Sequence, residues 1–310
     1  MLENIIESCK YVSINSKHVS INEEKLNQFI EKIENIKMEH WLSSSPFGLL
    51  ELPVETIINF LLIYESIDFS FWGSPKWSIE TDSDKLDGSI ALLYALLKYV
   101  KKSKTTDLSN VSQECFSNIL KGNIEIPLLE ERFKIIKEIS TIVNEKMQGN
   151  FYQYIKHITS DAELFETIIK YFPSFKDERT YNNQTIYFYK LAQLLTSDIL
   201  HIREQKEKIE VDYTHLVGCA DYKIPQILRG IGILNYDDEL SKIVDNQIEI
   251  PTNSIYEVEI RANMLTVIDM INQKLNHKYS SIDINDYLFM QKKNKNLTLK
   301  PYHLTRCTNY

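Results

Sequence analysis

Asp221 is the residue best placed to do chemistry, because it lies four positions before Pro225 in a run that also holds Cys219 and Tyr222. Proline is favoured in the first turn of a helix, so Asp221 stands where a capping carboxylate is expected. Such a cap stabilises a helix by about 1 kcal/mol. The same helix-end donors keep a carboxylate ionised, and an ionised carboxylate can stabilise an oxocarbenium-like sugar. Asp221 is therefore either a structural cap or a catalytic carboxylate.

A second cluster sets aromatic side chains beside a carboxylate. Asp68 is followed closely by Phe71 and Trp72, and Trp77 comes soon after. Aromatics at such a corner normally fill the core, with the aspartate capping a turn. The alternative is a wall on which a flat base stacks, a contact worth about 1 to 3 kcal/mol.

Several cationic side chains can bind a phosphate or simply pair with a neighbouring carboxylate. Lys190 follows an aromatic run, and Arg261 follows two glutamates. His303 and Arg306 lie three apart near the end of the sequence, a position that usually carries little function. The pattern does not choose between the two interpretations.

The common phosphate-loop, dinucleotide, zinc-protease and serine-hydrolase signatures are absent. The seven histidines are scattered, and the four cysteines (Cys9, Cys115, Cys219 and Cys307) form no pair with metal-site spacing. We expect no metal and no cofactor, and thiols that stay reduced in a cytoplasmic protein.

Composition predicts a globular protein, with 43% apolar and 25% charged residues. A net charge of −8 opposes binding to a polyanion, so no stable nucleic-acid partner is expected. One or two buried cations can still hold a small anionic ligand such as a nucleotide. The sequence has neither a signal-peptide pattern nor a run of about 20 apolar residues, so we expect no membrane association.

Only eight glycines and eight prolines occur, too few for the turns of an all-β protein of 310 residues. The fold class expected is all-α or nearly so. Helical spacing of apolar residues and end signals predict helices over 53–64, 89–101, 128–147, 162–171, 224–228 and 256–276.

Residues 185–189 are β-branched and aromatic, which suits a strand, but they run directly into a helical pattern. We predict that they begin that helix. No repeat, low-complexity tract or linker divides the chain. One multi-helix domain over residues 1–310, either undivided or with two lobes, is the simplest expectation.

Taken in order, these motifs resemble the queuosine salvage family of queuosine 5′-phosphate N-glycosylases/hydrolases. The resemblance runs from about Trp41 to the end of the sequence. Its segments are weak singly and specific together: DFSFW at 68–72, IPLLEERFKII from 126, FPSFKDE at 172–178, FYKLAQLL at 188–195, ADYKIPQIL at 220–228, EVEIRA at 257–262, DYL at 286–288 and PYHLTRC at 301–307.

The resemblance implies a helical fold similar to the helix-hairpin-helix DNA glycosylases and a small nucleotide as substrate. The implied reaction is hydrolysis of queuosine 5′-monophosphate, or also of queuosine, to release queuine for salvage into tRNA modification. Asp221 matches the catalytic aspartate, and Phe71 and Trp72 match the aromatic wall. Asp286 and Tyr287 fall in a segment that contributes to the base pocket.

Chemistry assigns further roles within that resemblance. Asp68 or Asp286 can accept from N–H donors of the base, and Lys190, His303 or Arg306 can hold the 5′-phosphate. Asp221 can stabilise the sugar cation, activate the water or bond transiently to C1′, and the sequence leaves these three open.

Three positions depart from the family's pattern. Asp68 stands where Asn is usual, Cys219 where Phe is usual and Met290 where an acidic residue is usual, so base recognition differs in detail. Two alternatives remain. A non-catalytic helical module would bind queuine or a nucleotide without turnover, whereas a nucleic-acid base glycosylase would need a basic docking face, which the net charge opposes.

Overall fold

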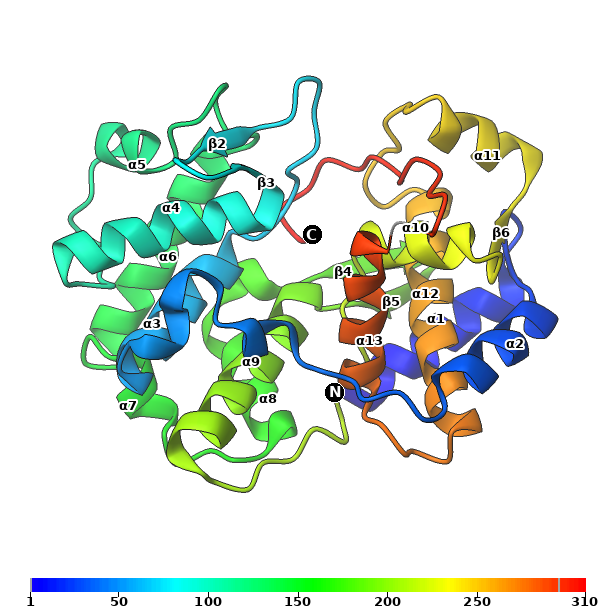
Figure 1. Cartoon of the computed structure of the whole chain (residues 1–310), viewed down its shortest axis with the longest axis horizontal. Coiled ribbons are helices and arrows are strands. Elements are labelled where there is room, and N and C mark those ends of the chain that lie inside the picture. Colours follow the sequence, from blue (N-terminus) through cyan, green and yellow to red (C-terminus); the bar gives the residue numbers. More distant parts are fainter. Residues whose placement is uncertain (1, 295) are drawn as a thin grey trace. The chain divides into compact units, whose positions relative to one another are not determined.

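A computed structural model describes residues 2–294 and 296–310, and its chain is built mainly of helices (Figure 1). The strands of the described chain form antiparallel pairs, so the prediction of a nearly all-α fold is confirmed. Two compact units are distinguished, and each is described by itself. Unit 1 holds residues 1–43, 177–197 and 212–306, and unit 2 holds residues 44–176, 198–211 and 307–310. The single domain expected over residues 1–310 stays a prediction.

Unit 1 combines helices with two short antiparallel strand pairs, β1 with β6 and β4 with β5. Its elements are α1 (Leu2–Asn15), β1 (Val19–Ile21), α2 (Glu23–Ile33), β4 (Glu178–Tyr181), β5 (Gln184–Tyr187), the start of α9 (Lys190–Glu207), α10 (Lys223–Gly230), β6 (Leu234–Tyr236), α11 (Asp238–Asp245), α12 (Ile255–Lys274), α13 (Ser281–Met290) and the 3₁₀ turn η4 (Gln291–Lys293).

Helix α12 is the central element of unit 1, with α1 and α13 packed along it (Figure 1). It was predicted over 256–276 as an amphipathic helix, but it is buried on nearly all sides. Its buried charges are therefore bonded: Glu259, for example, accepts from the backbone N–H groups of Lys17 and His18 at 2.9 and 2.7 Å. Polar anchors inside α12 thus fix the segments around it.

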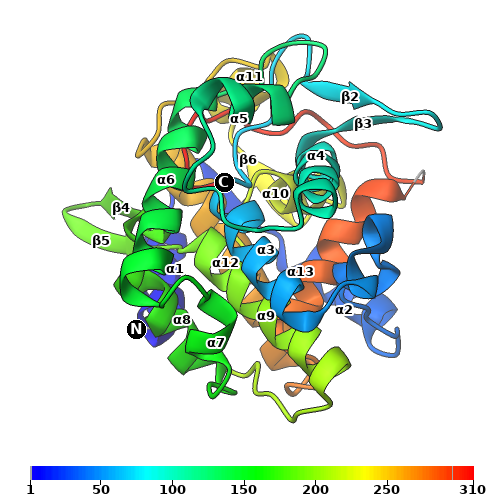
Figure 2. The same ribbon diagram turned by 90° about the vertical axis from the view of Figure 1, so that its left-hand side faces the viewer.

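Unit 2 is a group of helices with one strand pair, β2 with β3. Figure 2 shows α3 beside α4 and α6, the helices that pack on it. Its elements are η2 (Pro46–Glu51), α3 (Val54–Ser66), β2 (Ser78–Glu80), β3 (Lys85–Asp87), α4 (Gly88–Ser103), α5 (Gln113–Ile119), α6 (Leu129–Lys146), α7 (Phe151–Ile155), α8 (Asp161–Tyr171), η3 (Pro173–Phe175) and the end of α9.

All six predicted helices are present with ends shifted by a few residues, but the assignment of residues 185–189 was wrong. They do not begin a helix: Gln184–Tyr187 is strand β5, and α9 begins at Lys190. Asn182 and Asn183 both have positive φ, 47° and 62°, which is the backbone of a two-residue hairpin turn. This Asn-Asn turn pairs the segment with β4 and overrides the helical pattern that follows.

The segment 301–310 is bonded to the rest of the chain rather than frayed. Ile250 donates its N–H to the carbonyl of Leu304 at 2.7 Å, and Gln247 donates to the carbonyl of Tyr302 at 3.0 Å. Tyr310 is buried. No helix in the described part of the chain combines the length and apolar character needed to span a membrane.

Candidate active site

The segment 217–222, here named the Asp221 loop, is held from three helices of unit 1. From α9, the Gln193 side-chain oxygen accepts from the N–H groups of Val217 and Gly218 at 2.9 and 3.2 Å. Gly218 has φ +124°, and a Cβ there would meet the Ile268 side chain at 3.0 Å. The loop therefore needs glycine at this point to approach α12 closely.

The two peptides before Asp221 are each fixed by a buried side chain. Asn285 of α13 accepts from the N–H of Cys219 at 2.9 Å. Arg261 of α12 donates its Nε–H to the carbonyl of Ala220 at 2.9 Å. Because donors and acceptors on both sides are paired, the loop enters α10 in one defined conformation.

Asp221 itself closes the start of α10. Its Oδ1 accepts from the N–H groups of Lys223 and Ile224, both at 2.9 Å, so the capping role is confirmed although the residue flanking the helix is Tyr222. Within the described chain both of these bonds end on Oδ1. The arrangement leaves Oδ2 to face a ligand.

The electrostatics of Asp221 differ from the sequence-based expectation. Burial outweighs the helix-end donors and raises the pKa of Asp221 above its ordinary value, while the positive charges of Lys190 and Lys223 lower it. Donors thus oppose the shift without cancelling it. A carboxylate with a raised pKa is the better proton acceptor.

Lys190 lies at the first position of α9 and is buried, with 6% of its surface exposed. Its N–H donates to Asp177 Oδ2 at 3.3 Å. Its ammonium acts on the Asp221 carboxylate, as the pKa of Asp221 shows. A buried ammonium beside a carboxylate can stabilise that carboxylate or bind an anionic ligand next to it.

Asp286 is buried in α13 and bonded within unit 1. Its Oδ2 accepts from the N–H of Trp41 at 3.2 Å and lies 3.9 Å from Nε2 of His40. Tyr287, the next residue, points to α2, where its ring lies 6.3 Å from that of Phe29. The two neighbours therefore serve different surroundings, and of the pair Asp286 has the polar one.

Tyr222 and the 301–306 segment meet at the start of α10. The Tyr222 ring lies 4.9 Å from that of Tyr302, and Nζ of Lys223 lies 4.0 Å from the Tyr302 ring centre. Arg306 is partly exposed, with its Nε 3.9 Å from Oε1 of Glu249. Of the predicted phosphate ligands, Arg306 thus has a loosely placed carboxylate partner.

His303 is buried and uncharged at neutral pH. Burial, with a smaller effect from the positive charge of Arg261, lowers the pKa of His303 to about 3. It can donate a hydrogen bond to a phosphate but cannot supply positive charge. Among the predicted phosphate ligands, only Lys190 and Arg306 can do so.

Asp68, Phe71 and Trp72 lie in unit 2, in the segment 67–72, here named the aromatic segment. All three are buried. Arg132 of α6 donates to the carbonyls of Ile67 and Phe69, and its guanidinium lies 4.3 and 4.8 Å from the ring centres of Phe69 and Phe71. The segment is therefore anchored from beneath by a fully buried arginine.

Ser70 bends the aromatic segment. It has φ +43°, a conformation that residues other than glycine rarely adopt. Its N–H donates to the carbonyl of Tyr310 at 2.9 Å, and its hydroxyl donates to the carbonyl of Cys307 at 2.7 Å. Strain of this kind persists where the surroundings enforce it, often at ligand sites.

Acidic side chains gather near the aromatic segment within unit 2. Glu65, Asp68 and Asp198 are buried around Tyr64, whose hydroxyl is paired with Ser89. Burial, and then the negative charges of Asp68 and Glu65, raise the pKa of Tyr64 well above its ordinary value. Tyr64 is therefore a protonated hydrogen-bond donor beside Asp68.

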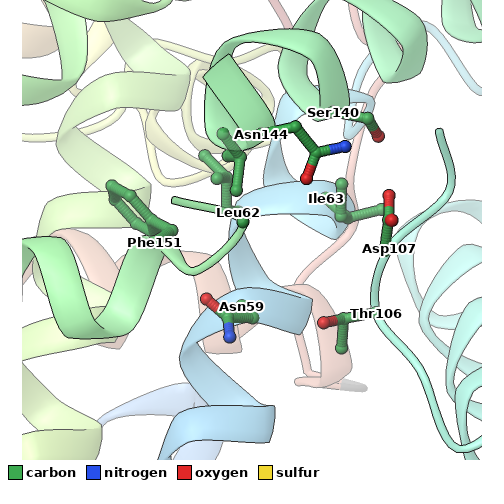
Figure 3. Close-up of a pocket in the computed structure, with 10 residues that line it drawn as sticks. Asn59, Leu62, Ile63, Thr106, Asp107, Ser140, Asn144 and Phe151 are labelled. Carbon is green, nitrogen blue, oxygen red and sulfur yellow. The ribbon is translucent and has the colours of Figure 1, made fainter. Parts of the chain in front are cut away.

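Unit 2 also holds a small pocket between α3 and α6 (Figure 3). Its volume of about 30 Å³ suits one or two water molecules rather than a nucleotide. Its labelled lining includes Asn59, Ser140 and Asn144. None of the predicted site residues lines this pocket.

In unit 1 the structure brings Asp221, Cys219, Tyr222 and Lys190 to one loop and helix start. Sequence reasoning missed the side chains that hold this loop, Gln193 and Asn285. It also left Arg261 open between phosphate binding and ion pairing; Arg261 pairs with Asp177 and Glu257. Gln193 lies three positions after Lys190, a helical spacing that marks the same face of α9.

The helical fold and the pair of Asp221 and Lys190 define a protein suited to stabilising positive charge next to an anionic group. The chain matches the family described as queuosine salvage protein over residues 51–310, and it belongs to that family.

Curated relatives carry the name queuosine 5′-phosphate N-glycosylase/hydrolase. The protein of Sphaerobacter thermophilus is 32% identical over 265 residues, covering 83% of this chain and 82% of the relative. That of Mus musculus is 27% identical over 336 aligned positions, covering 98% of both. That of Schizosaccharomyces pombe is 23% identical over 325 positions, covering 93% and 91%.

Proposed function

We propose that this protein is an N-glycosidase that hydrolyses queuosine 5′-monophosphate to queuine and ribose 5-phosphate. The observation that carries the proposal is the Asp221 carboxylate: one oxygen is fixed by two backbone donors, and a buried lysine lies beside it. Family membership and the names of the relatives support the substrate.

In the proposed reaction the bond between C1′ of the ribose and the base nitrogen breaks, and its electron pair leaves with the base. Positive charge develops on the sugar, and the Asp221 carboxylate stabilises it. Water attacks C1′ and passes a proton to Oδ2 of Asp221, for which the raised pKa of this group is favourable. The departing base nitrogen takes up a proton.

We assign the remaining candidates to binding. Lys190 and Arg306 hold the 5′-phosphate, with His303 as a neutral donor. Phe71 and Trp72 stack on the base, and Asp68 and Asp286 accept from its N–H groups. Cys219, Tyr222 and Tyr287 line the base and sugar sites. The residues of unit 1 and unit 2 named here are proposals drawn from the family resemblance.

We also propose that the substrate is a free nucleotide in the cytoplasm and that no nucleic acid or membrane partner is required. The net charge of −8 supports the first part, since a polyanion needs a basic face. Free cysteines support the second, because the cytosol keeps thiols reduced.

The test is incubation of purified protein with queuosine 5′-monophosphate and, in parallel, with queuosine. Free queuine is resolved by chromatography. We expect release from the monophosphate at a higher rate than from the nucleoside, because only the former has the phosphate that Lys190 pairs with. A folded protein that releases queuine from neither would refute the proposal and favour a binding module.

A further inference from the structure

Beneath the Asp221 loop lies a group of four buried charged side chains: Asp177, Arg179, Glu257 and Arg261. Arg261 Nη2 lies 2.5 Å from Asp177 Oδ2, and Arg261 Nη1 lies 3.3 Å from Glu257 Oε1. Arg179 pairs with the same two carboxylates at 3.2 and 3.0 Å. Two arginines and two carboxylates balance formally, so neutralising charge does not require any one of the four bonds.

Asp177 connects this group to Lys190. Its backbone carbonyl accepts from the N–H groups of Phe188 and Tyr189 at 3.0 and 3.3 Å, and its side chain accepts from the N–H of Lys190. Tyr189 has φ +49°, so the chain turns sharply just before α9. The position of Asp177 therefore sets where α9 begins and where Lys190 stands.

Arg261 connects the same group to Asp221. Its Nε–H donates to the carbonyl of Ala220 at 2.9 Å while its two terminal nitrogens bond Asp177. Its guanidinium also lies 4.0 Å from the ring centre of Phe188. One rigid planar group thus touches both the peptide before Asp221 and the carboxylate under Lys190.

We propose that Arg261 is a positioning residue for the reaction: by bonding Ala220 and Asp177 at once, it fixes the spacing between the Asp221 carboxylate and the Lys190 ammonium. This inference rests on the proposed function for its catalytic meaning. A displacement of about 1 Å in a reacting group costs about 100-fold in rate, so a residue that touches no substrate can limit kcat.

Arg261→Lys separates positioning from charge. Lysine keeps a positive charge beside Asp177, but a compact ammonium cannot reach Asp177 and the Ala220 carbonyl in the fixed fork geometry of a guanidinium. We expect kcat to fall about 10- to 100-fold while KM changes less than about threefold. Hydrogen exchange of the amides in 219–223, measured without substrate, should become faster.

Two controls match this change. Arg203→Lys alters another buried arginine, which donates to the carbonyls of Ile158 and Lys156 in unit 2, and should lower the melting temperature without lowering kcat. Glu257→Gln removes a charge from the same group but leaves both the Asp177 and Ala220 bonds of Arg261, so kcat should stay within about threefold of the parent.

The outcomes are distinct. A kcat for Arg261→Lys within about threefold of the parent, unchanged exchange in 219–223, or an equal loss of kcat in Glu257→Gln would each overturn the positioning role. If the parent protein releases no queuine, the proposed function fails instead, and the exchange measurement still decides whether Arg261 fixes the loop.

Discussion

The two segments that carry the predicted site chemistry, the Asp221 loop and the aromatic segment, are each held by a buried arginine in a different way. Arg132 holds the aromatic segment through carbonyl oxygens and ring faces. Arg261 holds the Asp221 loop through one carbonyl while bonded to two carboxylates. The first arrangement fixes shape, and the second also fixes charges relative to one another.

This difference suits the two tasks. A stacking surface needs flat rings in a stable place, and its energy varies gradually with small displacements. A carboxylate that meets developing charge must be placed within a fraction of an ångström, and its field depends on every charge nearby. Changes in the Asp221 loop should therefore act on kcat, and changes in the aromatic segment on KM.

The largest effect is expected for Asp221→Asn. The amide keeps the shape and one acceptor for the cap but carries no negative charge, so kcat should fall by about 1000-fold or more. Rates of queuine release measure this. Asp237→Asn is the matched control, because Asp237 caps α11 by accepting from Leu240 at 2.8 Å. It should cost about 1 kcal/mol of stability and leave kcat intact. An active Asp221→Asn enzyme would contradict the mechanism.

Lys190→Met should have the next largest effect. The positive charge of Lys190 lowers the pKa of Asp221, so its removal raises that pKa further. Because the ionised carboxylate is the active form, activity is lost as pH falls through this pKa, and the acid limb of kcat should move to higher pH. We also expect a fall in kcat of about 100-fold at neutral pH.

The control for Lys190→Met is Lys206→Met in the same helix, where the lysine is exposed and donates to the carbonyl of Leu50. Its pH profile should match that of the parent. If the acid limb of Lys190→Met stays where it is in the parent, the charge of Lys190 does not act on Asp221 during turnover.

Phe71→Leu tests the other side of the comparison. Loss of a ring that stacks on the base should cost about 1 kcal/mol of binding, which raises KM about fivefold with little change in kcat. Phe60→Leu removes another buried ring of unit 2, stacked on Tyr64, and should change only stability. Equal KM values for Phe71→Leu and the parent would place the base elsewhere.

The smallest effect on activity is expected for His303→Gln, whose consequence is for stability. The pKa of His303 is about 3 in the folded protein and ordinarily 6.5, so the unfolded chain takes up a proton that the folded chain does not. Stability contributed by the neutral form is present above pH 6.5 and is lost as pH falls towards 3. Urea unfolding at several pH values should show a flatter dependence in His303→Gln.

The sequence predicted much of the site because its signals are local. An aspartate just before a proline-containing helix start can cap that helix, and Asp221 does so with two bonds. The Asn182-Asn183 turn was equally local but was overlooked, which made residues 185–189 seem to continue into α9. Gln193 and Asn285 were beyond reach, because their roles depend on helices that pack against the Asp221 loop from distant parts of the chain.

By itself the sequence determined the helical fold class, the family and the chemical type of each candidate residue, since these follow from composition, periodicity and the order of short motifs. Tertiary structure decided the charge state of those residues. Burial raises the pKa of Asp221 and lowers that of His303, and it leaves Arg261 paired rather than open to phosphate. Solvation and the field of neighbouring charges depend on which segments meet in space, so a pattern along the chain cannot reveal them.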